Sequence, residues 1–336
     1  MPSSKSLSEP PLVESYKQLV DKSVEIQQLC LCEIVDECEL PLIELSGLRS
    51  ENGGKHLGCV EAIGKAASEW GFFQVVNHGV SHELLAEMRR EQMKLFEMPF
   101  ETKARSKLLN DSYRWGTPTA TSAKQFSWSE AFHVPLAKIS EEGSWNEELG
   151  STREVMEKLA GELSELAHKV AGALVENLGF HGEVSTKKCS KSTCFLRLNH
   201  YPTCPYAWEA FGLVPHTDSD FLTILHQDQV GGLQLMKDSR WVAVKPNPDA
   251  LIVNIGDLFQ AWSNGIYKSV EHKVIANAQA QRYSIAYFLC PSHESTIGSC
   301  REPSMYKKFT FGEFRKQVQE DVRRTGHKVG LPRFLL

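Results

Sequence analysis

The chain has 336 residues, of which 41% are hydrophobic and 24% are charged, a composition typical of a globular protein with a substantial core. Its formal net charge of −5 and the lack of any block of basic residues argue against nucleic acid as a partner. No run of about 18 apolar residues is present, so we expect no membrane-spanning helix. The nine cysteines have no recurring spacing, and we expect free thiols in a reducing compartment, the cytoplasm, with the nucleus as an alternative.

The first part of the chain is predicted to be a flexible leader over residues 1–38, which is polar and contains two adjacent prolines. An N-terminal module is expected over residues 39–135, beginning with a short strand at 40–45. A helix is predicted next and a strand follows it at 71–79, before Ser81 as the N-cap of a second helix. The first of these helices is indicated by apolar residues three or four positions apart, namely Leu57, Val60, Ile63, Ala67 and Trp70.

The second part is expected to hold a connecting segment and a long helix over residues 136–190, a β-rich core over 191–295, and a C-terminal helix and tail over 296–336. Ser151–Glu154 has the capping-box pattern, and the apolar stripe that follows it ends at a glycine. Short strands separated by glycine, proline and asparagine are typical of a β-sandwich or barrel. Thr310–Glu313 is a second capping box, which opens the C-terminal helix with Phe314, Val318 and Val322 facing inward. The pattern predicts one α+β unit.

A metal site is indicated by His216-Thr-Asp218 together with the distant His272. Two imidazoles and one carboxylate are the ligand set of ferrous iron in non-haem oxygenases, and they leave positions open for a co-substrate and oxygen. Residues two apart in a strand point the same way, so His216 and Asp218 can reach one metal. His272 lies in an alternating β-rich segment. His226 and His293 remain alternatives, although His226 is more simply a structural histidine or one at the edge of a pocket.

Over nearly its whole length, the chain resembles the plant 2-oxoglutarate- and iron(II)-dependent dioxygenases. The motifs that carry this resemblance are residues 40–45 and 70–79 in the N-terminal module, and 199–205, 216–218, 231–235, 254–257, 272 and 282–284 in the catalytic module. The resemblance implies a double-stranded β-helix (jelly-roll) core with N-terminal helices and a C-terminal helix. It also implies Fe(II), 2-oxoglutarate as co-substrate, O2, and ascorbate as reductant.

Three further stretches, residues 113–122, 129–133 and 194–202, resemble the gibberellin 2-oxidases, in particular the class that acts on twenty-carbon gibberellins. That resemblance implies hydroxylation at the 2β position, which inactivates the hormone precursor, coupled to decarboxylation of 2-oxoglutarate to succinate. The expected partner is therefore a small-molecule gibberellin, and the oligomeric state is left open.

The same resemblance implies roles for individual residues. Iron is expected on His216, Asp218 and His272. The far carboxylate of 2-oxoglutarate requires a cation and a hydroxyl, for which the forked guanidinium of an arginine is well shaped. The residues expected to contact 2-oxoglutarate are Arg282, Ser284, Tyr201, Asn199 and Val274.

The substrate pocket of such an enzyme should be apolar with a few polar anchors. The residues expected to line it are Tyr113, Arg114, Trp115, Phe132, His133, Arg197 and Phe288. Arg114 is the candidate anchor for a substrate carboxylate, and an exposed surface arginine is its alternative. Other functions left open are an activating gibberellin oxidase, a flavonoid or terpenoid hydroxylase, a non-catalytic hormone-binding protein on the same fold, and a zinc hydrolase.

Overall fold

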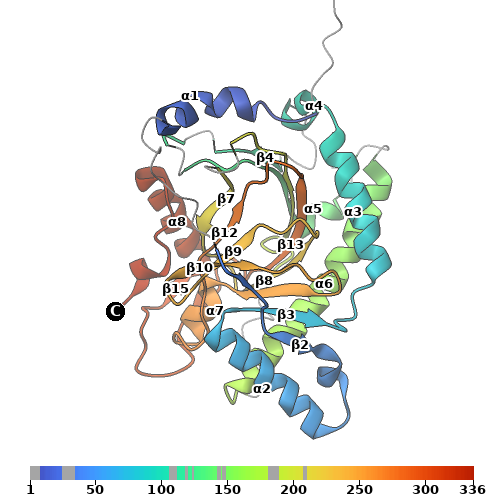
Figure 1. Ribbon diagram of the computed structural model, residues 1–336. Coiled ribbons are helices and arrows are strands. Elements are labelled where there is room, and N and C mark those ends of the chain that lie inside the picture. Colours follow the sequence, from blue (N-terminus) through green and yellow to red (C-terminus); the bar gives the residue numbers. More distant parts are fainter. Residues whose placement is uncertain are drawn as a thin grey trace, which may run out of the picture.

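The computed structural model describes residues 8–24, 35–105, 112–117, 120–122, 125–141, 145, 149–180, 189–206 and 210–336. Two curved sheets form the walls of a barrel, and the helices lie outside it (Figure 1). The larger sheet has the order β2 (Leu42–Glu44), β3 (Phe72–Val76), β11 (Leu251–Ile255), β8 (Leu222–Gln227), β13 (Arg282–Leu289), β6 (Phe195–Tyr201), β5 (Glu130–Pro135) and β4 (Tyr113–Trp115). The smaller one has the order β1 (Glu37–Cys38), β10 (Arg240–Val244), β9 (Leu233–Lys237), β12 (His272–Ile275) and β7 (Phe211–His216). This arrangement confirms the predicted α+β jelly-roll fold.

The pairing of β6 with β13 determines which side chains enter the barrel. The two strands are antiparallel, with Arg282 opposite Tyr201 and Ser284 opposite Asn199. Residues directly opposite each other share one face of a sheet, and successive residues of a strand alternate between its faces. Tyr201, Asn199, Arg282 and Ser284 therefore share the inner face. Their apolar neighbours, such as Leu198 and Ile285, are buried on the outer face.

Helices cover the outer face of the larger sheet. The main ones are α2 (Gly53–Glu69), α3 (His82–Glu97) and α6 (Gly150–Asn177), and shorter segments are α4 (Phe100–Arg105), η1 (Leu45–Arg49) and α5 (Leu136–Ile139). Ser81 caps α3 as predicted, because its side chain accepts a hydrogen bond from Leu84 N. The helix predicted from the apolar spacing is present as α2, in which Val60, Ile63 and Ala67 are buried and Leu57 is 53% exposed.

The predicted long helix is present, but its capping box is wrong. The helix begins at Gly150, and its N-cap, Leu149, makes no side-chain hydrogen bond. The hydroxyl groups of Ser151 and Thr152 instead donate to Glu91 of α3, at 3.1 Å and 2.6 Å. These two residues therefore join α6 to α3 rather than cap their own helix.

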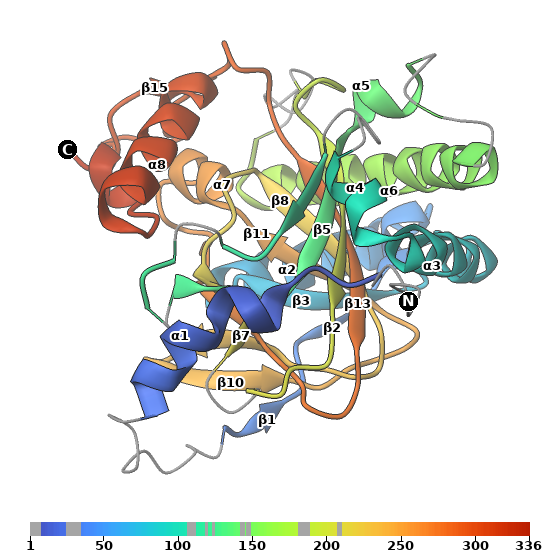
Figure 2. The same cartoon turned by 90° about the horizontal axis from the view of Figure 1, so that it is seen from above.

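The predicted flexible leader is wrong for the part that the structure describes. Residues Leu12–Val24 form α1, which lies along the barrel near β4 and β7 (Figure 1 and Figure 2). Tyr16 is buried and stacks on Phe126, with ring centroids 4.2 Å apart. A few apolar side chains at helical spacing therefore hold this short polar segment against the barrel. The composition of the segment alone does not reveal that spacing. Residues 1–7 and 25–34, the latter including Cys30 and Cys32, lie outside the described residues.

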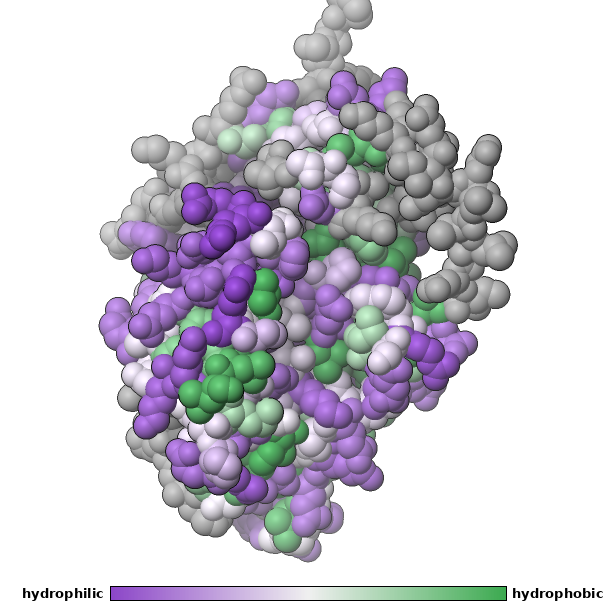
Figure 3. All heavy atoms as spheres, turned by 90° about the vertical axis from the view of Figure 1, so that its left-hand side faces the viewer, coloured by the Kyte–Doolittle hydropathy of each residue, from purple (hydrophilic) through white to green (hydrophobic). Residues whose placement is uncertain are grey.

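The C-terminal helix α8 (Phe311–Thr325) begins with the predicted capping box, in which Thr310 and Glu313 exchange hydrogen bonds. It ends at Gly326 with φ 77°, a left-handed conformation that suits glycine. Phe314 is fully buried, whereas Val322 is 44% exposed, so its predicted inward position is wrong. Hydrophilic side chains predominate on the coloured part of the face that carries α8 (Figure 3). The remaining elements are α7 (Asp257–Trp262), β14 (Thr296–Ile297), β15 (Phe309–Thr310) and η5 (Leu331–Phe334).

Two expectations drawn from composition agree with the described part of the chain. The seven cysteines in it are all free thiols. Among the described residues, no helix combines the length and apolarity needed to cross a membrane.

The Thr310 cap provides a test of local stability. Thr310→Ala should lower the free energy of unfolding by about 1 kcal/mol, because it leaves a backbone N–H of the first turn of α8 without its acceptor. Urea unfolding followed by circular dichroism measures this change. Thr310→Ser keeps the hydroxyl group and is the control. Equal losses in both variants would show that the cap contributes nothing.

Candidate metal centre and binding cavity

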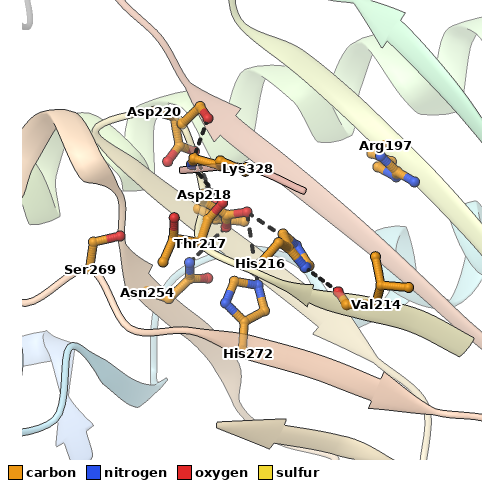
Figure 4. Close-up of polar contacts among 12 residues, drawn as sticks. Arg197, Val214, His216, Thr217, Asp218, Asp220, Asn254, Ser269, His272 and Lys328 are labelled. Atoms are coloured by element: carbon orange, nitrogen blue, oxygen red, sulfur yellow. Dashed lines mark hydrogen bonds and ion pairs between the residues drawn. The ribbon is translucent and has the colours of Figure 1, made fainter. Parts of the chain in front are cut away.

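Three side chains meet where the two sheets come together. His216 ends β7 and His272 begins β12, and these residues are direct partners in the antiparallel pair. Their Nε2 atoms lie 3.6 Å and 3.8 Å from Asp218 Oδ1, respectively (Figure 4). One potential ligand atom from each residue lies within 4.8 Å of the other two. The three atoms can therefore contact a single metal ion, and this is the only group of three or more such ligands among the residues described.

Strand alternation does not position Asp218, contrary to the sequence argument, because β7 ends at His216. The carboxylate is positioned by two donors from the larger sheet. Thr223 Oγ1 and Asn254 Nδ2 donate to Asp218 Oδ2 at 2.6 Å and 2.7 Å. Oδ1 is thus left facing the imidazoles. One oxygen of Asp218 is therefore free to bind a metal ion, and the protein holds the other.

Both imidazoles are oriented in the same way. Nδ1 of His216 lies 2.8 Å from Val214 O, and Nδ1 of His272 lies 3.1 Å from Val270 O. A carbonyl oxygen can only accept a hydrogen bond, so Nδ1 carries the proton in each ring. The lone pair of each Nε2 is then free to bind a metal ion.

The charges of the site suit a cation. Burial, aided by His272, lowers the pKa of His216 to about 3, so this imidazole is neutral at pH 7. Burial raises the pKa of Asp218, but His272, His216 and the donors Thr223 and Asn254 outweigh it and hold the value at about 2. A neutral imidazole and an anionic carboxylate are the forms in which these groups bind a metal. The donor set, two imidazoles and one carboxylate, suits ferrous iron.

The tail after α8 reaches back to the loop that carries Asp218. Lys328 Nζ forms a buried ion pair with Asp257 Oδ2 at 2.6 Å and donates to Thr217 O at 2.9 Å. Ser269, three residues before His272, donates to the other oxygen of Asp257 at 2.7 Å. These contacts join the two segments that supply the ligands. Sequence reasoning missed Lys328, which has no local motif, and assigned no role to Asp257.

A cavity of about 230 Å³ extends from the metal site between the sheets. The five residues predicted to hold 2-oxoglutarate all line it: Arg282, Ser284, Tyr201, Asn199 and Val274. Their roles remain predictions, although the arrangement fits a dianion.

Arg282 carries the strongest indication of an anionic ligand. It is 2% exposed, and no carboxylate in the described part of the chain pairs with it. One amino group donates to Gln227 Oε1 at 2.8 Å, but Arg282 Nε and Gln227 Nε2 are buried without a partner in the described structure. A buried guanidinium with unused donors is costly unless an anion is bound. The residues present therefore fit the far carboxylate of 2-oxoglutarate. Sequence reasoning missed Gln227.

Only three of the seven predicted substrate residues line the cavity, namely His133, Arg197 and Phe288. Tyr113, Trp115 and Phe132 were assigned to it wrongly. In the β4–β5 pair, Tyr113 lies opposite Phe132 and Trp115 opposite Glu130, and these four share the face that is turned away from the cavity.

Arg114 shares the inner face with Ala131 but lies on the edge strand, exposed and outside the cavity. Its predicted role as substrate anchor is therefore not supported. Tyr113 instead donates its hydroxyl to Glu130, which also contacts Lys103 Nζ and His200 Nδ1, each at 2.7 Å. This buried charge network lies behind the cavity wall and belongs to the outer core.

The alternative distant ligands lie elsewhere. His226 points to the outer face of β8, because its neighbours Leu225 and Gln227 occupy the inner face, and burial lowers its pKa to about 4. His293 stacks on Phe311, with centroids 5.5 Å apart.

Comparison with known proteins agrees with this geometry. A family model described as the 2OG-Fe(II) oxygenase superfamily matches residues 192–291, and one described as non-haem dioxygenase in morphine synthesis N-terminal matches 40–153. The chain is 57% identical to gibberellin 2-beta-dioxygenase 6 of Oryza sativa subsp. japonica, over 97% of this chain and 96% of the relative. It is 52% identical to gibberellin 2-beta-dioxygenase 8 of Arabidopsis thaliana, over 95% of each. The crystal structure of JOX2 in complex with 2OG, Fe and JA has a TM-score of 0.73 at 32% identity, over 93% of this chain and 94% of that one.

The contact of Lys328 with the ligand loop predicts an effect on metal affinity. Lys328→Met should weaken Fe(II) or Mn(II) binding by about 10- to 100-fold, as is usual when groups that orient metal ligands are lost. Metal titration of the apoprotein, followed by tryptophan fluorescence, measures this effect. Lys316→Met removes an exposed lysine of α8 and is the control. Unchanged affinity together with a lower melting temperature would reduce Lys328 to a purely structural role.

The unused donors of Arg282 predict opposite effects on stability and on ligand response. Arg282→Met should leave the melting temperature of the protein without 2-oxoglutarate equal or higher, because an unpaired buried charge is removed. The same variant should lose the stabilisation that 2-oxoglutarate gives the wild type. Thermal shift with and without the co-substrate measures both, with the exposed Arg240→Met as control. A variant that is still stabilised by 2-oxoglutarate would remove Arg282 from its binding site.

Proposed function

Because the chain belongs to the 2OG-Fe(II) oxygenase family, we propose that it is a gibberellin 2-beta-dioxygenase that acts on twenty-carbon gibberellins. Relatives whose names state the 2-beta-dioxygenase activity match almost the whole chain, and the walls of the cavity are within the match. The observation that carries the proposal is a single cavity that joins three elements: a metal-ligand triad, an anion clamp and an apolar wall with its own arginine.

Bound Fe(II) and 2-oxoglutarate supply the activation of oxygen, coupled to decarboxylation of the co-substrate to succinate, with ascorbate as the reductant. The protein holds the reactants in place. Asp218 keeps one oxygen for the metal because Thr223 and Asn254 occupy the other. Phe72 meets the ring of His272 edge-on at 5.2 Å and restricts its orientation. Orientation and exclusion of water are what such a site contributes to the rate.

The end of the cavity away from Arg282 suits a rigid apolar acid. Phe195 stacks on Phe288 with centroids 4.3 Å apart, and His133 stacks on Phe195 at 3.8 Å. Burial and the charges of nearby arginines lower the pKa of His133 to about 4, so it is neutral at pH 7 and part of the apolar wall. Arg197 donates to Asn199 Oδ1 at 2.8 Å and lies apart from the metal ligands (Figure 4). Its guanidinium can hold a substrate carboxylate while the ring system rests on the aromatic wall.

The proposed activity is tested with purified protein, Fe(II), ascorbate, 2-oxoglutarate and a panel of gibberellins and flavanones. We expect twenty-carbon gibberellins to gain one hydroxyl group at the 2β position, with one succinate formed per product, because the apolar wall and Arg197 orient one acid in one way. Mass spectrometry and nuclear magnetic resonance identify the products. Asp218→Ala, which lacks a metal ligand, is the inactive control. Hydroxylation of flavanones alone, or of a different gibberellin carbon, would overturn the proposal.

A further inference from the structure

A second compartment of about 230 Å³ adjoins the cavity on the side of α8. The two compartments share His133, Phe195, Ser219 and Phe288 in their walls. The first compartment has to accommodate the keto-diacid beside the metal, which leaves little room for a tetracyclic diterpenoid. The second compartment doubles the space within reach of the shared aromatic wall. The inference below rests on the proposed function.

Arg315 of α8 is the cationic residue of this second compartment. It is half-buried, and its guanidinium carbon lies 5.8 Å from the ring centroid of Phe311. Among the described residues no salt bridge within 4.0 Å joins Arg315 to an acid, although Asp220 lines the same compartment. The carboxyl group of Asp220 is instead in contact with Thr223 Oγ1 at 2.9 Å. A guanidinium in an apolar compartment without a carboxylate partner favours an anionic ligand.

Arg197 is the corresponding residue of the first compartment, and it too forms no salt bridge in the described part of the chain. The positive charges of both Arg197 and Arg315 act on His133, which lies in the shared wall. The cavity therefore has one arginine in each compartment and neutral, flat side chains between them.

We propose that Arg315 determines substrate specificity by binding a second carboxylate of the substrate, while Arg197 faces the first. This arrangement selects apolar polycyclic dicarboxylates. Twenty-carbon gibberellins belong to that class, because they keep as a free carboxylate the group that the nineteen-carbon hormones close into a lactone. Discrimination between twenty-carbon and nineteen-carbon gibberellins then depends on the positive charge of Arg315 on α8.

The test compares three substrates: an open dicarboxylic gibberellin, the same acid esterified at the carboxylate that the lactone would consume, and a nineteen-carbon lactone. Arg315→Gln should raise the KM for the diacid by about 10- to 100-fold, the usual effect of losing a hydrogen bond to a charged group. The KM values for the ester and the lactone should not change, nor should the KM for 2-oxoglutarate. Wild-type protein should prefer the diacid to its ester by a similar factor.

The matched control is Arg324→Gln, which removes the same charge from an exposed position of the same helix, where it pairs with Glu320. Arg315→Lys keeps the charge and should restore part of the affinity for the diacid. Melting temperatures report whether each variant is folded. The inference is overturned if Arg315→Gln weakens diacid and ester equally, if Arg324→Gln has the same effect, or if wild type does not distinguish diacid from ester.

A binding experiment separates this inference from the proposed function. The open dicarboxylic gibberellin and its monoester are titrated against wild type and Arg315→Gln by thermal shift without Fe(II), so that no turnover occurs. If the diacid stabilises the wild type more than Arg315→Gln, the monoester stabilises both equally, and no gibberellin is converted in the complete assay, the anion site stands and the proposed function fails. If gibberellins are converted without dependence on Arg315, the function stands and the inference fails. Without conversion and without binding that depends on Arg315, both fail.

Discussion

The opposition of His216 and His272 across the antiparallel pair of β7 and β12 is the contact on which the site depends. Because directly paired residues point to the same side of a sheet, one backbone register brings together two imidazoles that lie far apart in the chain. The third ligand depends on the other sheet, since Thr223 of β8 and Asn254 of β11 orient the carboxylate of Asp218. The site therefore exists only where the two sheets meet, and the rest of the fold serves to hold that junction.

The same alternation separates two kinds of buried polar group. On the outer side of the larger sheet, charges are neutralised within the protein, as in the contact of Lys103 with Glu130 at 2.7 Å. On the inner side, Arg282 has no carboxylate partner among the described residues and keeps an unused donor. Buried charges are costly unless they are paired, so the charges of the outer network are compensated within the wall, whereas the unpaired inner arginine favours the binding of an anion. The face of the sheet on which a side chain lies thus decides whether it packs in the outer core or lines the cavity.

The helices contribute through single long-range contacts. Gln92 of α3 lies on the outer side of the larger sheet. Its side chain donates to the carbonyl oxygens of Asn199 and Ser284, at 3.0 Å and 2.9 Å. It connects the helix layer to the two strands that hold the predicted co-substrate contacts. The tail after α8 does the same for the metal loop through Lys328 and Asp257. In the loop after β11, a Cβ atom at Gly256 would collide with Asp220, so only glycine allows this close approach.

By itself, the sequence determined the local features and the chemistry. The capping box at Thr310 depends on neighbours in the chain, and the candidate metal ligands and the predicted co-substrate contacts follow from residue types in a recognisable order. Only the tertiary structure decided which faces turn inward. Tyr113 and Phe132 were misplaced because alternation tells that neighbouring residues point opposite ways, not which way the barrel lies. Lys328 had no local signal either, since its partner Thr217 is 111 positions away and only folding brings them together.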